Sequence, residues 1–241
     1  MRVNPVFRSD LRYRLTSRKG GTMITVYLAV LGALAFLSLP PDLGRLDDLR
    51  QEGLLLAFLI VETVLAAYLT SAAASGEIIV EGEKSVWDLA ASPFPPGVIG
   101  RGKVLTAAAF ALLLISLAAP FLAIVSGIRG EPVQAVARAA VVALPFVAAL
   151  GSFGALYAGV FESDFTRSFV HWLTLLLLVV GATALPPPWD TLSPVRLVTL
   201  AARDGLGLRV LLGAVIYATL AAVAGVGITR RVEAVRGDTR D

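Results

Sequence analysis

The chain has 241 residues, of which 56% are apolar and only 16% are charged. A mean hydropathy of +0.78 excludes a water-soluble globule with an ordinary polar surface and predicts a membrane protein. The formal net charge of +3 comes with no soluble basic module, which argues against nucleic acid as a partner. Cysteine is absent, so disulfides, thiolate metal sites and cysteine nucleophiles are excluded.

Residues 1–21 form a basic segment ahead of the first apolar run. Asn4-Pro5 is typical of a helix start, with a capping side chain followed by proline in the first turn. Phe7, Leu11 and Leu15 then recur every four residues and place an apolar stripe on one side. We therefore expect an amphipathic helix in the cytoplasmic headgroup region, with a plain basic tail as the alternative.

Six apolar runs follow, each near the length needed to cross a hydrocarbon core about 30 Å thick. They are predicted at Thr22–Leu39, Leu54–Ala74, Val104–Ser126, Ala139–Phe161, Phe169–Leu185 and Val210–Ile228. Proline and glycine clusters separate most of the runs. Residues 162–167, between the fourth and fifth runs, are interpreted as a solvated, charged hairpin, with a second cytoplasmic contact as the alternative. The predicted fold class is all-α, a polytopic membrane protein with one six-helix domain over residues 22–229.

The distribution of Lys and Arg predicts the orientation. With the N-terminus inside, the inner segments hold two thirds of the 21 Lys and Arg residues, as the positive-inside rule requires. An even number of spans then places both termini, including a tail at residues 230–241, in the cytoplasm. We expect a multi-pass protein of the cell (plasma) membrane, with a cytoplasmic arm at residues 75–103 between the second and third spans.

Glu62 is the outstanding polar residue within the spans, because it lies near the middle of the second one. A charge at the bilayer centre costs about 2.5 to 3.5 kcal/mol on insertion scales, so the side chain is expected to face protein or a water-filled cavity. Two interpretations remain open. Glu62 is either part of a translocation pathway or a protonated or hydrogen-bonded carboxyl between helices.

The fourth span carries small residues at helical spacing, which let another helix approach closely. They are Ala148, Ser152, Ala155 and Gly159. The face predicted from them serves either packing within one chain or an interface with a second copy. The sequence alone does not decide between the two.

No catalytic residue, metal ligand or cofactor-binding residue is predicted in this chain. His171 lacks carboxylate or thiolate neighbours and is interpreted as an interfacial side chain at the inner end of the fifth span. Gly97 to Lys103 fits the spacing of a phosphate loop, but Val104 stands where such a loop needs Ser or Thr. This segment also opens an apolar span, so we expect no ATP binding by this chain.

The arm between the second and third spans reads "GEIIVEGEKSVWDLAASPFPPGVIGRGK" from Gly76 to Lys103. Its first half is acidic, an apolar patch surrounds Trp87, and the prolines after Ser92 end any helix there. This order is typical of a short helix that docks on a soluble partner. The alternative is a helix that packs back on the membrane interface with Trp87 as a belt residue.

After an N-terminal "NPVFRSDLRYRL" and two spans, the chain carries, in order, acidic residues, Trp-Asp-Leu, Ser-Pro-x-Pro, and Gly-Lys before a new span. This order of features resembles that of the permease subunits of type-2 ABC transporters of the exporter type. The resemblance covers the whole chain. It implies a coupling helix that contacts a separate ATPase subunit. Residues in or beside that helix would be Glu77, Glu81, Glu83, Trp87, Asp88 and Leu89, with Gly102 and Lys103 at the inner mouth of the third span.

The resemblance therefore implies a permease subunit of an ATP-driven exporter that pairs with a second copy or a similar permease. ATP and magnesium would be bound by the partner ATPase, and this chain would be no enzyme. Family members often carry short re-entrant helices in the outer segment that corresponds to residues 186–208. The chain has "DLAASP" where members often show a Leu-rich run, so its docking surface is smaller or suited to a particular partner. The alternative is a non-ABC membrane enzyme or a membrane anchor or assembly factor.

Overall fold

The computed structural model describes residues 4–37, 54–76, 90–129 and 132–238, and these contain helices and turns without a strand. Six helices in the described part are long and apolar enough to cross a membrane, which confirms the predicted spans in number and order. They are α2 (Arg18–Leu37), α3 (Leu54–Ser75), α5 (Pro96–Arg129), α6 (Val133–Val160), α7 (Asp164–Val179) and α9 (Leu208–Asp238). The shorter elements are α1 (Pro5–Thr16), α8 (Pro194–Arg203) and the 3-10 turns η2 (Gly181–Ala184) and η3 (Trp189–Leu192).

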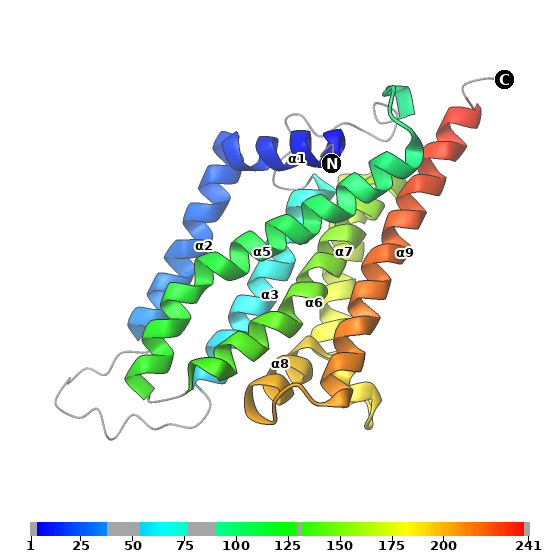
Figure 1. Ribbon diagram of the computed structural model, residues 1–241. Coiled ribbons are helices and arrows are strands. Elements are labelled where there is room, and N and C mark those ends of the chain that lie inside the picture. Colours follow the sequence, from blue (N-terminus) through cyan, green and yellow to red (C-terminus); the bar gives the residue numbers. More distant parts are fainter. Residues whose placement is uncertain (1–3, 38–53, 77–89, 130–131, 239–241) are drawn as a thin grey trace.

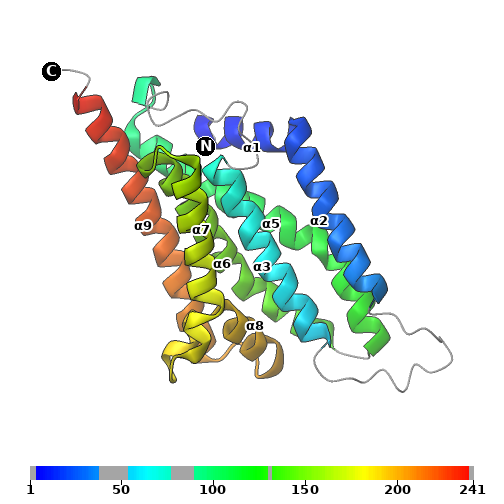
Figure 2. The ribbon, with the colours of Figure 1, turned by 180° about the vertical axis from the view of Figure 1, so that it is seen from behind.

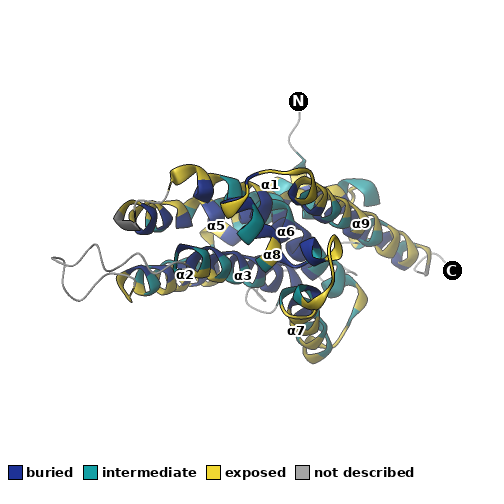
Figure 3. Cartoon of the chain, turned by 90° about the horizontal axis from the view of Figure 1, so that it is seen from below, coloured by how far each residue is buried: buried dark blue, intermediate teal, exposed yellow. Residues whose placement is uncertain are grey.

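The bundle is built around α6, which contacts α3, α5, α7, α8 and α9. Seen from below, α6 and α8 lie inside, while α2, α7 and α9 present exposed sides outward (Figure 3). We call the end that holds α1, the start of α5 and the C-terminal end of α9 the arm end, and the opposite end, which holds α8, the cap end (Figures 1 and 2). The exposed sides of the long helices are rich in Leu, Val and Phe, as expected of surfaces that face lipid.

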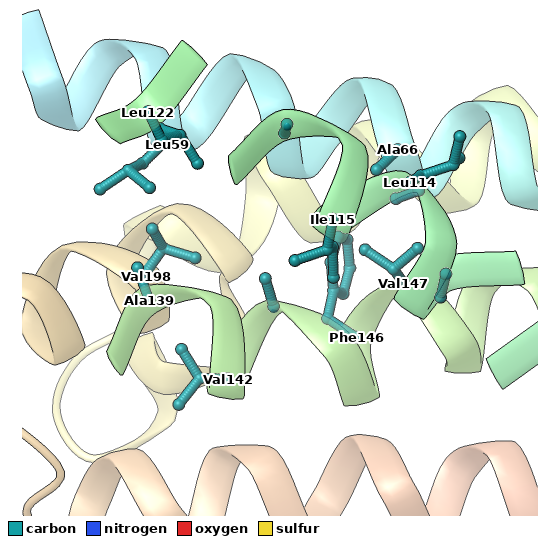
Figure 4. Packing of buried hydrophobic residues seen from close by; sticks show 14 of the residues in the cluster. Leu59, Ala66, Leu114, Ile115, Leu122, Ala139, Val142, Phe146, Val147 and Val198 are labelled. Atoms are coloured by element: carbon teal, nitrogen blue, oxygen red, sulfur yellow. The ribbon is translucent and has the colours of Figure 1, made fainter. Parts of the chain in front are cut away.

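The main core lies where α3, α5, α6 and α8 meet (Figure 4). Leu114 and Phe146 are fully buried in it, and the ring of Phe146 meets the edge of Tyr217 on α9 at a centroid distance of 5.0 Å. Many of the other buried side chains are alanine, especially on α3 and α6. Because alanine adds little bulk, these helices approach closely, as is usual where helix association depends on packing.

A close helix crossing joins α6 to α3. A Cβ atom added at Gly154 would lie 2.4 Å from the Ser71 carbonyl oxygen, and one added at Gly151 would lie 2.5 Å from Cγ2 of Thr70. At Gly154 the obstacle is backbone, so a side chain there forces the helices to shift, whereas at Gly151 the nearest atom is a side-chain methyl carbon. The glycine pair, at helical spacing i and i+3, therefore fixes the distance between the two helices.

The predicted small-residue face of the fourth span lies on α6. Ala148, Ser152 and Ala155 are buried within this chain, and Gly159 is partly buried. The Ser152 hydroxyl donates to the Ala148 carbonyl one turn earlier, at 2.8 Å, so its hydrogen bond is made within α6 and needs no partner from another helix. The tight contacts with α3 described above fall on the adjacent residues Gly151 and Gly154, which the spacing argument did not select.

Several helices extend beyond the predicted spans. α5 begins at Pro96, where proline fits the first helical turn, rather than at Val104. α9 continues past Ile228 to Asp238, so the predicted boundary before residue 230 falls inside a helix. This extension keeps an apolar side, because Val232 packs with Val6 and Ile99 in a separate cluster at the arm end. α7, in contrast, ends at Val179, where the chain tightens into η2.

The segment between α7 and α9 folds back against the cap end of the bundle. α8 buries Leu197, Val198 and Ala201 against α6 and α3. Arg209 at the start of α9 pairs with the buried Asp190 at 2.8 Å, and Tyr217 donates to the Leu192 carbonyl. This part of the chain is therefore a packed helical cap.

The glycine crossing predicts a stability difference. Gly154→Ala should destabilise the protein by about 1 to 3 kcal/mol, because the added methyl overlaps the Ser71 carbonyl and the helices must move apart. Gly21→Ala in α2 is the matched control, since no atom lies within 4 Å of its added Cβ atom. Thermal unfolding in detergent should show a lower Tm for Gly154→Ala and an unchanged or higher Tm for Gly21→Ala. Equal Tm values would contradict the tight crossing.

Candidate functional site

The predicted docking residues Glu77, Glu81, Glu83, Trp87, Asp88 and Leu89 lie outside the described residues. The structure instead describes the two segments that flank them, which end at Gly76 and begin at Ala90. Both flanks lie at the arm end, beside α1 and the C-terminal part of α9 (Figure 1). The candidate site is therefore defined by how these flanks are attached to the bundle.

The first flank is fixed by Arg167. α3 ends at Ser75, and Gly76 adopts a positive φ of 85°, as is common just after a helix. Arg167 Nη1 donates to the Ser75 carbonyl at 2.8 Å, and the same guanidinium pairs with Asp164. The hairpin at residues 162–167 is mostly exposed, as expected, but Arg167 also ties it to the end of α3.

The second flank is fixed by Arg236, on the extension of α9. Its guanidinium donates to three backbone carbonyls, at 2.8 Å to Ala90, 2.7 Å to Ser92 and 2.8 Å to Phe94. The fixed fork of guanidinium donors suits several acceptors at once, which an ammonium group would match less well. The sequence analysis counted Arg236 only as an inner positive charge and missed this role.

α1 is fastened across the first turns of α5. Asn4 caps α1 as predicted, accepting from the Val6 and Phe7 amides at 3.0 and 3.3 Å, and its Nδ2 donates to the Val98 carbonyl at 2.9 Å. Lys103 pairs with Asp10 at 2.7 Å. The first turns of α5 therefore contact the start of α1 through a hydrogen bond and an ion pair as well as through apolar packing.

The side of α1 that packs on the bundle differs from the predicted apolar stripe. Arg14 is buried, with its guanidinium carbon 5.7 Å from the centroid of the Phe110 ring on α5. Phe7 and Leu11 are only partly buried and Leu15 is exposed, so the predicted stripe borders the side that packs on the bundle and does not form its centre. The helix itself is present as predicted.

The phosphate-loop-like segment is helical in the structure, because Gly97 to Lys103 lie in the first turns of α5. Its glycines permit close packing. A Cβ atom at Gly100 would lie 2.5 Å from the Gly225 carbonyl oxygen of α9, and one at Gly102 would lie 2.7 Å from Cβ of Val6. This segment therefore has the geometry of a helix crossing rather than of a nucleotide-binding loop.

Glu62 lies at a junction of α2, α3 and α5 and is only 2% exposed. Oε1 lies 3.2 Å from the Tyr27 hydroxyl of α2, and Oε2 accepts from the Thr63 hydroxyl at 3.3 Å. The Tyr27 hydroxyl also lies 3.0 Å from the Leu114 carbonyl of α5. This geometry fits the interpretation of Glu62 as a hydrogen-bonded carboxyl between helices, while a role in a translocation pathway stays a prediction.

His171 is buried, so its interpretation as an interfacial side chain is wrong. Its ring stacks on Tyr68 of α3 at a centroid distance of 5.4 Å, while the neighbouring Trp172 is 53% exposed. The reason is that α7 packs on the bundle by a narrow side that holds His171 and Leu175. Within the described ranges, no group of three or more His, Asp or Glu residues is placed to hold a metal ion.

Comparisons with known proteins do not identify a family for this chain. No protein-family model matches it, and a search of curated proteins finds no match. The functional argument therefore rests on the geometry of the arm end. There, Arg167 fixes the segment that enters the arm, and Arg236 fixes the segment that leaves it.

The Arg236 contacts predict how fast the second flank opens. A hydrogen bond to a charged group is worth about 1.5 to 3 kcal/mol, so Arg236→Gln should accelerate local amide exchange about ten-fold or more. The reporters are the Val98 and Ile99 amides, which donate to the Pro95 carbonyl at 2.9 and 3.2 Å. Hydrogen exchange with mass spectrometry measures this difference.

The matched control is Arg230→Gln, which removes the same charge from an exposed position on the same helix. Its exchange at residues 90–99 should equal that of the wild type. If both variants accelerated exchange to the same extent, net charge rather than the Arg236 contacts would hold the flank.

Proposed function

We propose that this chain is the permease subunit of an ATP-driven, exporter-type ABC transporter of the type-2 class, and that the arm docks a separate ATPase. The proposed docking residues are Glu77, Glu81, Glu83, Trp87, Asp88 and Leu89. One observation carries the proposal: both flanks of the arm are bonded through arginine to helices other than the ones they continue. Arg167 ties the first flank to α7, and Arg236 ties the second to α9.

Such an attachment suits the transmission of force. A load applied to residues 77–89 passes directly along the chain into α3 and α5, and through the two arginines into α7 and α9. α1 adds a further connection, because Lys103 of α5 pairs with Asp10. In the proposed mechanism, the ATPases close on nucleotide, pull on the arms and shift the bundle between inward-open and outward-open states.

The position of α1 supports the same proposal. Its exposed side carries Arg8 and Arg12 beside the stripe of Phe7, Leu11 and Leu15. This combination suits a helix that lies in the cytoplasmic headgroup layer, with apolar side chains toward the acyl region and cations toward phosphates. The proposal places the arm end, with both termini, on the cytoplasmic side.

In this proposal the chain pairs with a second copy or a similar permease, and ATP and magnesium are bound by the partner ATPase. Hydrophobic or lipid-like cargo is favoured over sugars, because the buried parts of the described spans are largely apolar. Glu62 is the proposed pathway residue. The non-ABC alternatives do not explain why arginines fasten both sides of a short arm.

Affinity purification tests the proposal. The tagged chain, extracted from its native membrane in mild detergent, should bring along an ATP-binding subunit in stoichiometric amount. The double variant Trp87→Ala and Asp88→Ala should lose this subunit and its stimulated ATPase activity while still inserting in the membrane. Quantitative mass spectrometry and ATPase assays measure both effects.

Trp189→Ala provides the control, because Trp189 is exposed at the cap end and its loss should leave the complex intact. Recovery of the wild-type chain without any ATP-binding protein under several gentle conditions would contradict the permease proposal. Retention of the ATPase by the double variant would contradict only the assignment of the docking residues.

A further inference from the structure

The polar contacts at the Glu62 junction need more hydrogen atoms than the two hydroxyl groups there provide. Three contacts join oxygen atoms: Tyr27 Oη with Glu62 Oε1, Tyr27 Oη with the Leu114 carbonyl, and Thr63 Oγ1 with Glu62 Oε2. Each contact needs one hydrogen atom between its two oxygens to be attractive. The carbonyl of Leu114 has none to give.

The hydroxyls of Tyr27 and Thr63 supply only two hydrogens for these three contacts. If Glu62 were ionised, Tyr27 would satisfy either the carboxylate or the Leu114 carbonyl, and two acceptors would face each other across the remaining contact. A hydrogen on Glu62 Oε1 removes this conflict. The carboxyl then donates to Tyr27, Tyr27 donates to Leu114, and Thr63 donates to the other carboxyl oxygen.

The surroundings favour the same arrangement. Glu62 and Tyr27 are 2% and 0% exposed, and the nearby Ala66, Ala111 and Ala118 are fully buried. A carboxylate enclosed by apolar atoms needs a paired cation or a full set of donors, because burial without them is costly. The hydrogen bonds that the described residues make to this carboxyl come from Tyr27 and Thr63, both of which are neutral.

We propose that Glu62 is a proton-binding site, and that the bound proton closes the junction between α2, α3 and α5. The proton comes from water and forms an O–H bond on Oε1 as the helices pack. Tyr27 then relays the hydrogen-bond chain from α3 to the backbone of α5. Separation of α2 from α5 exposes the carboxyl to water, to which it returns the proton. This chemistry does not depend on a partner ATPase.

Three other ionisable groups buried or partly buried in the described bundle have their contacts elsewhere. Arg14 of α1 lies over the Phe110 ring, one turn nearer the arm end than Leu114. His171 of α7 stacks on Tyr68, and Arg138 of α6 donates to the Ala202 carbonyl at the cap end. Among the described residues, Tyr27 is the ionisable group whose side chain is in hydrogen-bond contact with the carboxyl.

Infrared spectroscopy of the purified protein tests the proposal, because a protonated carboxyl and a carboxylate absorb in separate regions. The difference between wild type and Glu62→Gln at neutral pH should show one protonated carboxyl band that shifts to lower wavenumber in heavy water. In Tyr27→Phe, which keeps the acid and removes its acceptor, the band should shift to higher wavenumber.

Asp190→Asn is the control, because Asp190 is buried but paired with Arg209. Its difference spectrum should contain carboxylate bands only. Carboxylate bands alone from Glu62→Gln would overturn the proposal, and their dependence on sodium would identify a bound metal cation instead.

A thermal measurement gives an independent readout. In the folded protein Glu62 holds a proton, whereas in the unfolded protein, where its carboxyl is exposed to water, it does not hold one at neutral pH. Raising the pH from about 7 to 9 should therefore lower the Tm of the wild type relative to that of Glu62→Gln. Parallel pH profiles for the two proteins would also overturn the proposal.

Discussion

The structure depends on one constraint, which is that the last carbonyls of each helix have no partner within that helix. In this bundle, arginine side chains from other helices supply several of the missing donors. The pairs are Arg167 of α7 with Ser75 of α3, Arg231 of α9 with Gly159 of α6, and Arg138 of α6 with Ala202 of α8. A cation is also favoured at a helix C-terminus by the helix dipole. Each such contact satisfies a helix end and joins two elements.

At the arm end, arginine also donates to backbone carbonyls that lie outside the helices. Arg236 binds the carbonyls of Ala90, Ser92 and Phe94 just before the chain enters α5. Prolines interrupt this segment, so it cannot satisfy its carbonyls by continuing a helix. The arginine makes the segment part of the bundle. Basic residues at this end hold its segments together, and the positive-inside rule predicts the same end to be cytoplasmic.

The sequence was sufficient for the six spans, because length and hydropathy act locally along the chain. It was not sufficient for contacts that depend on two distant segments. Nothing near Gly154 indicates that the Ser71 carbonyl will lie against it, and a backbone carbonyl has no sequence signature that would pair it with Arg236. The extension of α9 was missed because only Val232 and Val235 carry its apolar side among charged residues. His171 was misread because the buried side of α7 is so narrow.

Glu62 shows most clearly where local reasoning ends. Its position in the second span indicated that it needs a partner, but the partner comes from α2 and the chain of hydrogen bonds ends on α5. The buried side of α2 repeats every four residues through Met23, Tyr27, Leu31 and Ala35. The apolar side chains of this stripe would allow α2 to slide along a neighbouring helix. The Tyr27 hydroxyl, in contrast, meets its acceptors in only one position of α2 along that helix. The polar junction therefore selects the register of α2 that the apolar contacts alone leave open.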